Sequence, residues 1–137
     1  MLRTAVNAVG EEYGDEGVEI IHRAFIERTV KLGKEQAMKV QDNSLRSFCA
    51  ALEKGCLGTH KFKKLEDSDT RQAYCFTSCM WADVYKELGA PEIGFWICEG
   101  DGPAAKASNP SIGFSRTKTL MQGDECCDHV YYVKNKC

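Results

Sequence analysis

The chain has 137 residues, close to the commonest size of a single domain, and 43% of them are hydrophobic while 28% are charged. Its formal net charge of −2 lacks the basic excess that a nucleic-acid-binding surface needs. We therefore expect a single domain over residues 1–137 that binds no nucleic acid.

The amino-terminal region carries many charged residues. Arg3, Glu11, Glu12, Asp15 and Glu16 interrupt the apolar stretch that a signal peptide would require. The chain also lacks a run of about 18 apolar residues, the length of a membrane-spanning helix. We expect a cytoplasmic protein that does not bind a membrane and whose thiols are kept reduced.

The first part of the chain predicts helices. Apolar residues recur at helical spacing from Gly17 to Lys31, and Gly33 is placed as a stop after them. A second helical pattern runs from Lys34 to Lys54 and closes at Gly55. Its polar break at Asp42–Ser44 could kink or divide this helix.

The middle of the chain predicts a strand, a short helix and two loops. Arg71–Thr77 is a candidate strand, and Ser78–Leu88 is a candidate helix with Ser78 as its N-cap. The cluster Lys61–Lys64 precedes acidic residues and predicts a solvated loop, and Gly100–Pro110 predicts a loop or lid. Helices come first and the sheet later, so we predict an α+β fold with N-terminal helices packed on one face of a small antiparallel β-sheet containing a C-terminal hairpin.

The hairpin concentrates reactive side chains. Ser111–Leu120 alternates between two faces, as in a half-buried strand, and places Arg116 and Lys118 on the same face. A turn over Gln122–Asp124 leads to a second strand. Its side chains divide into two faces, Cys126, Asp128, Val130 and Tyr132 on one and Cys127, His129, Tyr131 and Val133 on the other. The two adjacent cysteines therefore point in opposite directions, and we expect one of them to share a pocket with the cations.

Several motifs of this region belong together. The hairpin carries Arg116-Thr-Lys-Thr-Leu, Gly123-Asp124 and Cys126-Cys127-Asp128, and Cys98-Glu-Gly-Asp101 precedes it. In these motifs the chain resembles the L-2-amino-thiazoline-4-carboxylic acid hydrolase family. The resemblance extends to the segment from Cys79 to Gly89 and to the amino-terminal helical part, and it covers roughly residues 5–133. It departs from that family's pattern at Met80, where the pattern has proline, and at His129, where it has an aromatic residue.

The resemblance implies that water adds to the amidine-like carbon of a 2-aminothiazoline ring and that the ring sulfur leaves, giving an N-carbamoyl-cysteine. This reaction needs a base or a thiolate nucleophile, and a cation for the substrate carboxylate. The candidate catalytic residues are Asp101, Cys126, Cys127 and Asp128. The candidates for binding a substrate that bears a carboxylate are Arg116, Lys118 and Asp124.

Asp128 lies in the middle of an otherwise apolar strand. A carboxylate there requires a partner, so we expect it to contact Arg116, Lys118 or a ligand. One interpretation makes it the catalytic base. The other makes it half of an ion pair across the hairpin, with a structural role only.

The chain contains eight cysteines but no Cys-x-x-Cys motif, and we expect most of them, Cys49 above all, to be small buried hydrophobic residues. A second interpretation of the site is a non-catalytic sensor or accessory module. In it, Cys79, Cys98 and Cys126 would converge with Asp101 on a small ligand or on a divalent metal such as zinc. We expect His60 to be exposed in a loop and His129 to serve as a packing residue.

Overall fold

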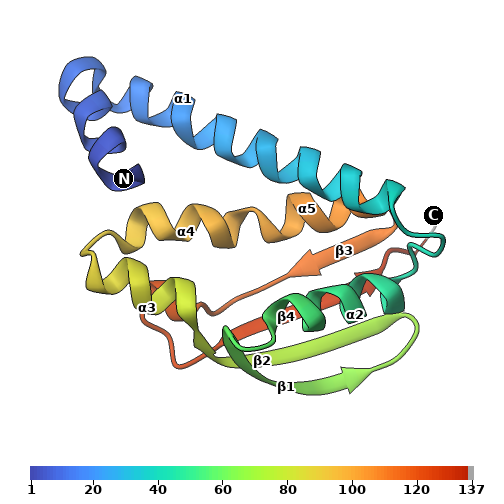
Figure 1. Cartoon of the computed structure of the whole chain (residues 1–137). Coiled ribbons are helices and arrows are strands. Elements are labelled where there is room, and N and C mark those ends of the chain that lie inside the picture. The colour runs from blue at the N-terminus through green and yellow to red at the C-terminus, as the bar shows by residue number, and fades with distance from the viewer. Residues whose placement is uncertain (136–137) are drawn as a thin grey trace.

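The computed structural model describes residues 1–135, so Cys137 lies outside the described part of the chain. A four-stranded sheet with the order β1-β2-β4-β3 forms its base, and every neighbouring pair of strands is antiparallel (Figure 1). The strands are β1 (His60–Asp67), β2 (Arg71–Cys79), β3 (Ile112–Ser115) and β4 (Cys127–Val133). The last two pair with each other, which confirms the C-terminal hairpin.

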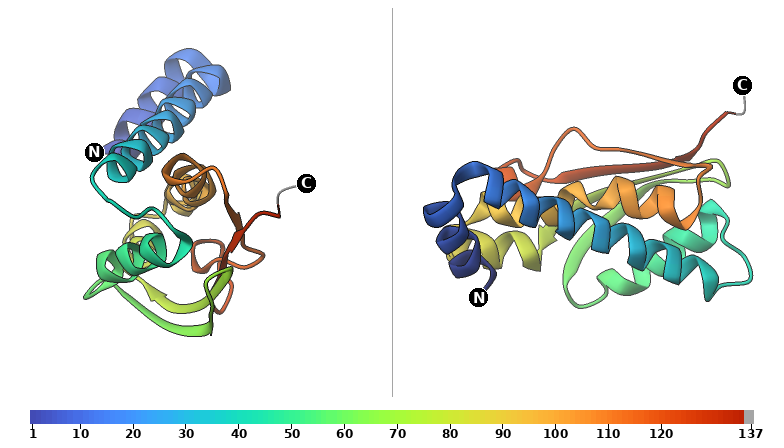
Figure 2. Two further views of the ribbon diagram at one scale, coloured as in Figure 1. Left: turned by 90° about the vertical axis from the view of Figure 1, so that its right-hand side faces the viewer. Right: turned by 90° about the horizontal axis from the view of Figure 1, so that it is seen from above.

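The helices lie on one side of this sheet. They are α1 (Leu2–Met38), α2 (Leu45–Cys56), α3 (Met80–Glu87), α4 (Pro91–Glu99) and α5 (Asp101–Ser108), with a short 3-10 turn at Leu120–Gln122. α2 packs on β2 and β4, and α5 packs on β3. α1 forms an outer layer against α4 and α5 (Figure 2). The predicted α+β fold is therefore confirmed.

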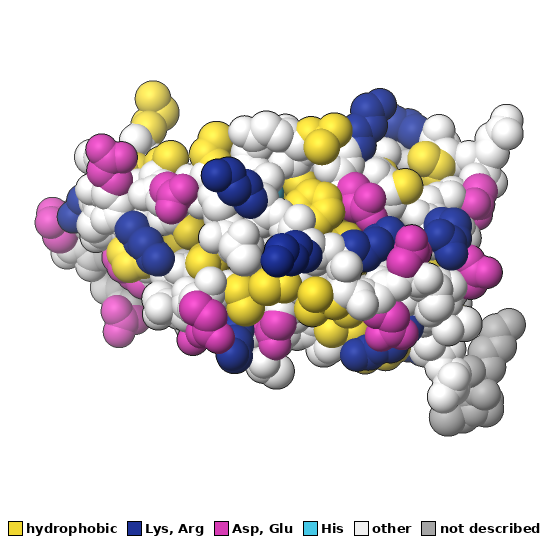
Figure 3. All heavy atoms as spheres, turned by 90° about the horizontal axis from the view of Figure 1, so that it is seen from below, with side chains coloured by type: hydrophobic (Ala, Val, Ile, Leu, Met, Phe, Trp, Pro, Cys, Tyr) yellow, Lys and Arg dark blue, Asp and Glu magenta, His cyan; other side chains and the backbone are white. Residues whose placement is uncertain are grey.

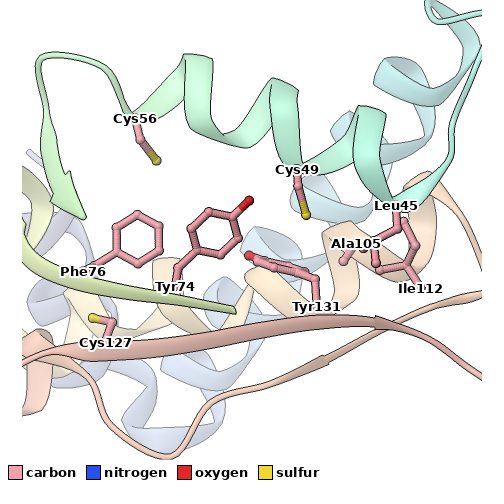
Figure 4. Packing of buried hydrophobic residues seen from close by; sticks show 9 residues of the cluster. All are labelled: Leu45, Cys49, Cys56, Tyr74, Phe76, Ala105, Ile112, Cys127 and Tyr131. Atoms are coloured by element: carbon pink, nitrogen blue, oxygen red, sulfur yellow. The ribbon is translucent and has the colours of Figure 1, made fainter. Parts of the chain in front are cut away.

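The main core lies between α2 and the inner face of the sheet. It contains Leu45, Cys49, Cys56, Tyr74, Phe76, Ala105, Ile112, Cys127 and Tyr131 (Figure 4). The hydroxyl of the buried Tyr74 donates to the carboxylate of Glu53 at 2.7 Å, and Lys64 pairs with the same carboxylate at 2.8 Å. This network joins β1 and β2 to α2 while satisfying the polar end of a core side chain.

The amino-terminal helix departs from the prediction. α1 continues through Gly33 to Met38, so the predicted stop at Gly33 is wrong. Gly33 is instead a point of close approach, because a Cβ there would lie 2.8 Å from the carbonyl oxygen of Ala104 in α5. Gly14, with φ at 67°, breaks α1 into two helical segments that run in different directions (Figure 1). The predicted break at Asp42–Ser44 is present and separates α1 from α2.

Two segments that we predicted as loops are regular elements. Residues 100–110 contain α5, because its alanines favour a helix and Pro103 falls in the first turn, where a missing N–H is tolerated. Lys61–Lys64 belong to β1, an edge strand of the sheet. Exposed lysines are common on such edges because they oppose pairing with another chain. Phe62 is the residue of this cluster that packs against the core.

The strand before the hairpin turn is shorter than predicted. β3 ends at Ser115 because the backbone that follows is hydrogen-bonded to the side chain of Asp128 instead of to a strand. This carboxylate accepts hydrogen bonds from the N–H groups of Thr117 at 2.8 Å and Lys118 at 2.6 Å. As a result, Arg116 and Lys118 do not share a strand face. The side chain of Arg116 is 11% exposed, whereas that of Lys118 is 47% exposed and pairs with Glu125.

The surface mixes charges of both signs. Figure 3 shows lysine and arginine interspersed with aspartate and glutamate on the face seen from below. Within the described residues, none of the helices combines the length and the apolar character needed to cross a membrane.

The packing of α4 against α3 and the 3-10 turn leaves no space for a side chain at Gly94. A Cβ there would lie 2.6 Å from Cγ of Tyr85 and 2.7 Å from Sδ of Met121. We expect Gly94→Ala to lower the free energy of unfolding by ~1–3 kcal/mol. The matched control is Gly55→Ala in α2, where a Cβ meets nothing within 4 Å. This control should raise stability by ~0.5–1 kcal/mol. Urea denaturation measures both, and a Gly94→Ala protein as stable as the control would contradict this packing.

Candidate active site

A cavity of about 170 Å³ lies between α2, the inner face of the sheet and helices α3 to α5. It is smaller than the roughly 300–1,000 Å³ of sites for drug-sized ligands, so it suits a small molecule. Four thiols, two imidazoles and a carboxyl group reach its wall. The lining residues are Leu52, Cys56, His60, Phe76, Cys79, Trp81, Ile97, Cys98, Asp101, Cys127 and His129.

Asp101 supplies the carboxyl group. It follows Gly100 at the junction of α4 and α5, and its side chain is 29% exposed. Nη1 of Arg116 donates to Oδ2 of Asp101 at 2.9 Å and to the carbonyl oxygen of Cys98 at 3.0 Å. Burial raises the pKa of Asp101 to about 7, and the guanidinium of Arg116 limits this rise. The carboxyl group therefore changes its charge near neutral pH.

His129 faces this carboxyl group from β4. Its Nε2 lies 3.8 Å from Oδ2 of Asp101, and its ring packs between those of Phe76 and Phe114, with centroids 4.9 Å and 5.2 Å away. Burial and, to a smaller extent, the charge of Arg116 lower the pKa of His129 to about 4. His129 is therefore a neutral imidazole at neutral pH. The ring packs against its neighbours as predicted, and it also lines the cavity.

His60 and Cys79 form a second pair on the cavity wall. They face each other as register partners at the ends of β1 and β2, and Sγ of Cys79 lies 3.3 Å from Nε2 of His60. Burial lowers the pKa of His60. Burial also raises the pKa of Cys79, although the backbone N–H groups at the start of α3 oppose that rise. The resting pair is therefore a neutral thiol beside a neutral imidazole.

The orientation of the Thr59 hydroxyl is linked to the nitrogen of His60 that carries the proton. The hydroxyl of Thr59 donates to the carbonyl oxygen of Cys56 at 3.2 Å, so its only proton is used. With the hydroxyl in this orientation, Nδ1 of His60, 2.8 Å from the Thr59 oxygen, donates to it. The lone pair of Nε2 is left facing the thiol of Cys79, which is the orientation of a base toward a nucleophile.

Cys98 and Cys127 meet on the opposite wall. Each Sγ lies 3.7 Å from the hydroxyl oxygen of the buried Thr119, and the backbone N–H of Leu120 donates to Cys127 at 3.2 Å. Burial raises the pKa of Cys98 to about 11, so this thiol keeps its proton. The contacts of these two cysteines are with a hydroxyl and a backbone amide rather than with a base.

The structure separates the predicted site residues into two groups. Asp101, Cys127, Cys79 and Cys98 line the cavity, and Arg116 supports Asp101 from behind. The other predicted residues, Cys126, Asp128, Lys118 and Asp124, do not line it.

The expected contact of Asp128 with the side chain of Arg116 or Lys118 is absent from the described structure, because Arg116 turns inward to Asp101. Asp128 binds the backbone of residues 117 and 118 instead. Asp124 accepts the N–H of Thr119 at 2.7 Å and so holds the turn. These two carboxylates shape the segment between β3 and β4.

The predicted metal ligands do not converge. Cys126 lies outside the cavity wall that Cys79 and Cys98 share. Among residues 1–135, no three histidine, cysteine, aspartate or glutamate side chains are arranged to hold a metal ion. The residues present therefore do not fit the zinc site of the second interpretation.

Our sequence analysis missed the contribution of His60. We expected an exposed loop residue, but β1 places its ring against Phe76, with centroids 5.9 Å apart, at the cavity wall. The local signal was a single apolar residue, Phe62, among lysines, which is too short an alternation to predict a strand.

The position of Asp128 generates a prediction. Burial raises the pKa of Asp128. Hydrogen bonds from the Thr117 side chain and from the backbone N–H groups of residues 117 and 118 together lower it by more, so the net pKa lies below its usual value. The resulting stabilisation is present above the unfolded-state pKa of about 3.9 and is lost as pH falls through the folded pKa. We expect Asp128→Asn to lose ~1–2 kcal/mol of unfolding free energy at pH 7 and much less at about pH 3.

Urea melts of the wild type and the Asp128→Asn variant at both pH values measure this difference. An equal loss at both values would show that charge is not the cause. Ligand binding in the cavity should survive the substitution, and its loss in a folded variant would favour the catalytic interpretation of Asp128.

Comparison with known proteins identifies the family of this chain. The family model described as L-2-amino-thiazoline-4-carboxylic acid hydrolase matches residues 1–131. A search of curated proteins found no match. Because the family model spans nearly all of the sheet and every helix, the chain belongs to the L-2-amino-thiazoline-4-carboxylic acid hydrolase family.

Proposed function

We propose that the protein hydrolyses a small cyclic amidine of the 2-aminothiazoline-4-carboxylate type in this cavity. The main support is Asp101, a carboxyl group with a pKa raised to about 7 by burial, held by Arg116 at a wall that also presents thiols and imidazoles. Such a perturbed group in a small cavity is typical of a catalytic site. Membership of the family favours this substrate class.

Asp101 suits the amidine end of the substrate. Arg116 occupies Oδ2, and Oδ1 accepts no hydrogen bond from the described side chains. A protonated 2-aminothiazoline presents the N–H of its ring and of its exocyclic amine along one edge, which a carboxylate can bind. This contact would keep the ring protonated, and the carbon between the two nitrogens would then be more easily attacked.

The overall reaction consumes one water molecule. The water oxygen bonds to the amidine carbon, the bond from that carbon to the ring sulfur breaks, and the sulfur leaves as a thiol. The two nitrogens remain on the carbon, so the product is an N-carbamoyl-cysteine. A neutral imidazole on the wall can accept the proton that water gives up.

The cavity wall offers less to the carboxylate of the substrate. In the described part of the chain, no lysine or arginine side chain lines the cavity, and the guanidinium of Arg116 is already engaged by Asp101 and Cys98. The amidine is thus the part of the substrate for which the wall provides a partner.

This difference predicts a ligand preference. We expect 2-aminothiazoline, which has the amidine and no carboxylate, to bind in competition with the full substrate. Thiazolidine-4-carboxylate, which has the carboxylate and no amidine, should bind at least about tenfold more weakly, since it leaves Asp101 without a partner. Calorimetric titration measures both, and the reverse order would show that the carboxylate is recognised first.

The reaction itself gives the direct test. We expect turnover of 2-aminothiazoline-4-carboxylate to a free thiol, and kcat/KM should rise as pH rises through about 7, because the ionised form of Asp101 binds the amidine. Asp101→Asn should lower kcat/KM by ~10²–10⁴-fold and remove this pH dependence. The matched control is Asp69→Asn, which alters an exposed carboxylate paired with Arg46.

Thermal melts must accompany the Asp101→Asn assay, because the variant leaves Arg116 buried beside an uncharged amide. If the variant does not fold, the pH profile of the wild type still tests the role of Asp101. Tight binding of the amidine without turnover would instead support the non-catalytic sensor or accessory module.

A further inference from the structure

We propose that Cys79 is the nucleophile of this site and that His60 is its general base, so that the ring is opened through a covalent bond to the enzyme. This inference rests on the proposed function and specifies its mechanism. It assigns to Cys79 a role different from the metal ligand considered above, and it gives His60 a function.

The geometry places a base directly beside a thiol. Nε2 of His60 lies 3.3 Å from Sγ of Cys79, within hydrogen-bond distance for sulfur. The chain of hydrogen bonds through Thr59 leaves Nε2 as the acceptor. The dyad therefore has a nucleophile, a base and a group that orients the base, the three parts by which activated nucleophiles are recognised.

The start of α3 adds a second favourable feature. Cys79 is the N-cap residue of this helix, and its side chain makes no capping hydrogen bond in the resting state. The backbone N–H groups of Trp81 and Ala82 oppose the effect of burial on the pKa of Cys79. A thiolate formed during the reaction is therefore stabilised where it forms, as at other helix N-termini.

The other thiols of the cavity wall lack this environment. Cys98 and Cys127 contact the hydroxyl of Thr119, which is not a base at neutral pH. Burial raises the pKa of Cys56 to about 11. Among the described cavity thiols, Cys79 is the one with an imidazole nitrogen within hydrogen-bond distance.

The first half of the reaction exchanges one carbon–sulfur bond for another. The thiol proton of Cys79 passes to Nε2 of His60, and Sγ bonds to the amidine carbon of the ring. The bond from that carbon to the ring sulfur then breaks, and the departing sulfur takes the proton back from His60. The product of this half is an isothiourea that joins Cys79 to an opened, thiol-bearing substrate, with every substrate atom retained.

The second half releases the enzyme. Water gives a proton to His60 while its oxygen bonds to the same carbon. The bond to Sγ breaks, and Cys79 recovers the proton from His60. The second proton of the water moves from the oxygen to a nitrogen, which leaves the carbonyl of a urea. One substrate and one water have become one N-carbamoyl-cysteine, and no atom has been oxidised or reduced.

One variant separates this mechanism from direct attack by water, and a second tests the base. Cys79→Ser keeps a hydrogen bond to His60 but replaces the thiol, and we expect turnover to fall at least ~10²-fold. His60→Asn keeps a donor toward Thr59 but removes the base, and we expect a fall of ~10²–10⁴-fold. The control is Cys75→Ala, which removes a thiol of the same strand outside the cavity and should retain wild-type turnover.

The covalent intermediate has its own readout. Acid quenching of the wild type during turnover, followed by mass spectrometry, should show a protein heavier by one whole substrate molecule, with the added mass on the peptide that contains Cys79. Two results would overturn the nucleophile assignment but leave the proposed function intact, provided that the wild type turns over the substrate. One is a Cys79→Ser variant that keeps more than about a tenth of the wild-type rate, and the other is an adduct on another cysteine.

A small electrophile tests the dyad independently of the natural substrate. 2-Chloroacetamidine carries an amidine for Asp101 and a reactive carbon for a neighbouring thiol. We expect it to alkylate Cys79 at least about tenfold faster than Cys75, and His60→Asn should slow this labelling. Fast labelling of Cys79 without turnover of any aminothiazoline would remove the proposed substrate and support the dyad. Labelling of Cys79 no faster than that of Cys75 would overturn the dyad.

Discussion

The hydrogen bonds of Arg116 connect the fold to the site. Nη1 of its guanidinium donates to the carboxylate of Asp101 and to the backbone carbonyl oxygen of Cys98 near the end of α4. The ring centroids of Phe95 and Phe114 each lie 5.6 Å from the guanidinium carbon. The pair joins the chain after β3 to the α4–α5 junction. It also fixes the carboxyl group at the cavity wall, so removing either partner leaves a buried group unpaired and alters the chemistry at the same time.

Strand alternation divides the reactive side chains of β4 between two environments. Cys127, His129 and Tyr131 face the interior and build the cavity wall and the core, whereas Asp128 on the other face organises the preceding loop. Adjacent residues of one motif therefore serve different purposes. The motif is conspicuous in the sequence because the cavity wall and the preceding loop both use its polar or sulfur-bearing side chains. The concentration of such side chains alone does not show which of them faces a ligand.

Features that depend on local pattern could be predicted, and features that depend on distant pairing could not. The α+β class, the hairpin, the opposite directions of the two adjacent cysteines and the contribution of Asp101 to the cavity followed from periodicity or from family motifs. β1 and α5 could not be predicted in this way. The lysines of β1 hide the alternation that is typical of a strand, and the Gly-Asp-Gly-Pro sequence at the start of α5 is typical of a loop. The partner of Arg116 and the proximity of His60 to Cys79 depend on strand register and helix placement, which no local pattern specifies.

The edge position of β1 makes the proposed dyad sensitive to local unfolding. His60 lies on a strand that has a partner on one side alone, and Lys64 ties this strand to Glu53 of α2 through a partly exposed ion pair. Edge strands open at a lower free energy than the centre of a sheet. Opening of this strand would separate the imidazole from Cys79, and salt would favour the opening because it screens the ion pair.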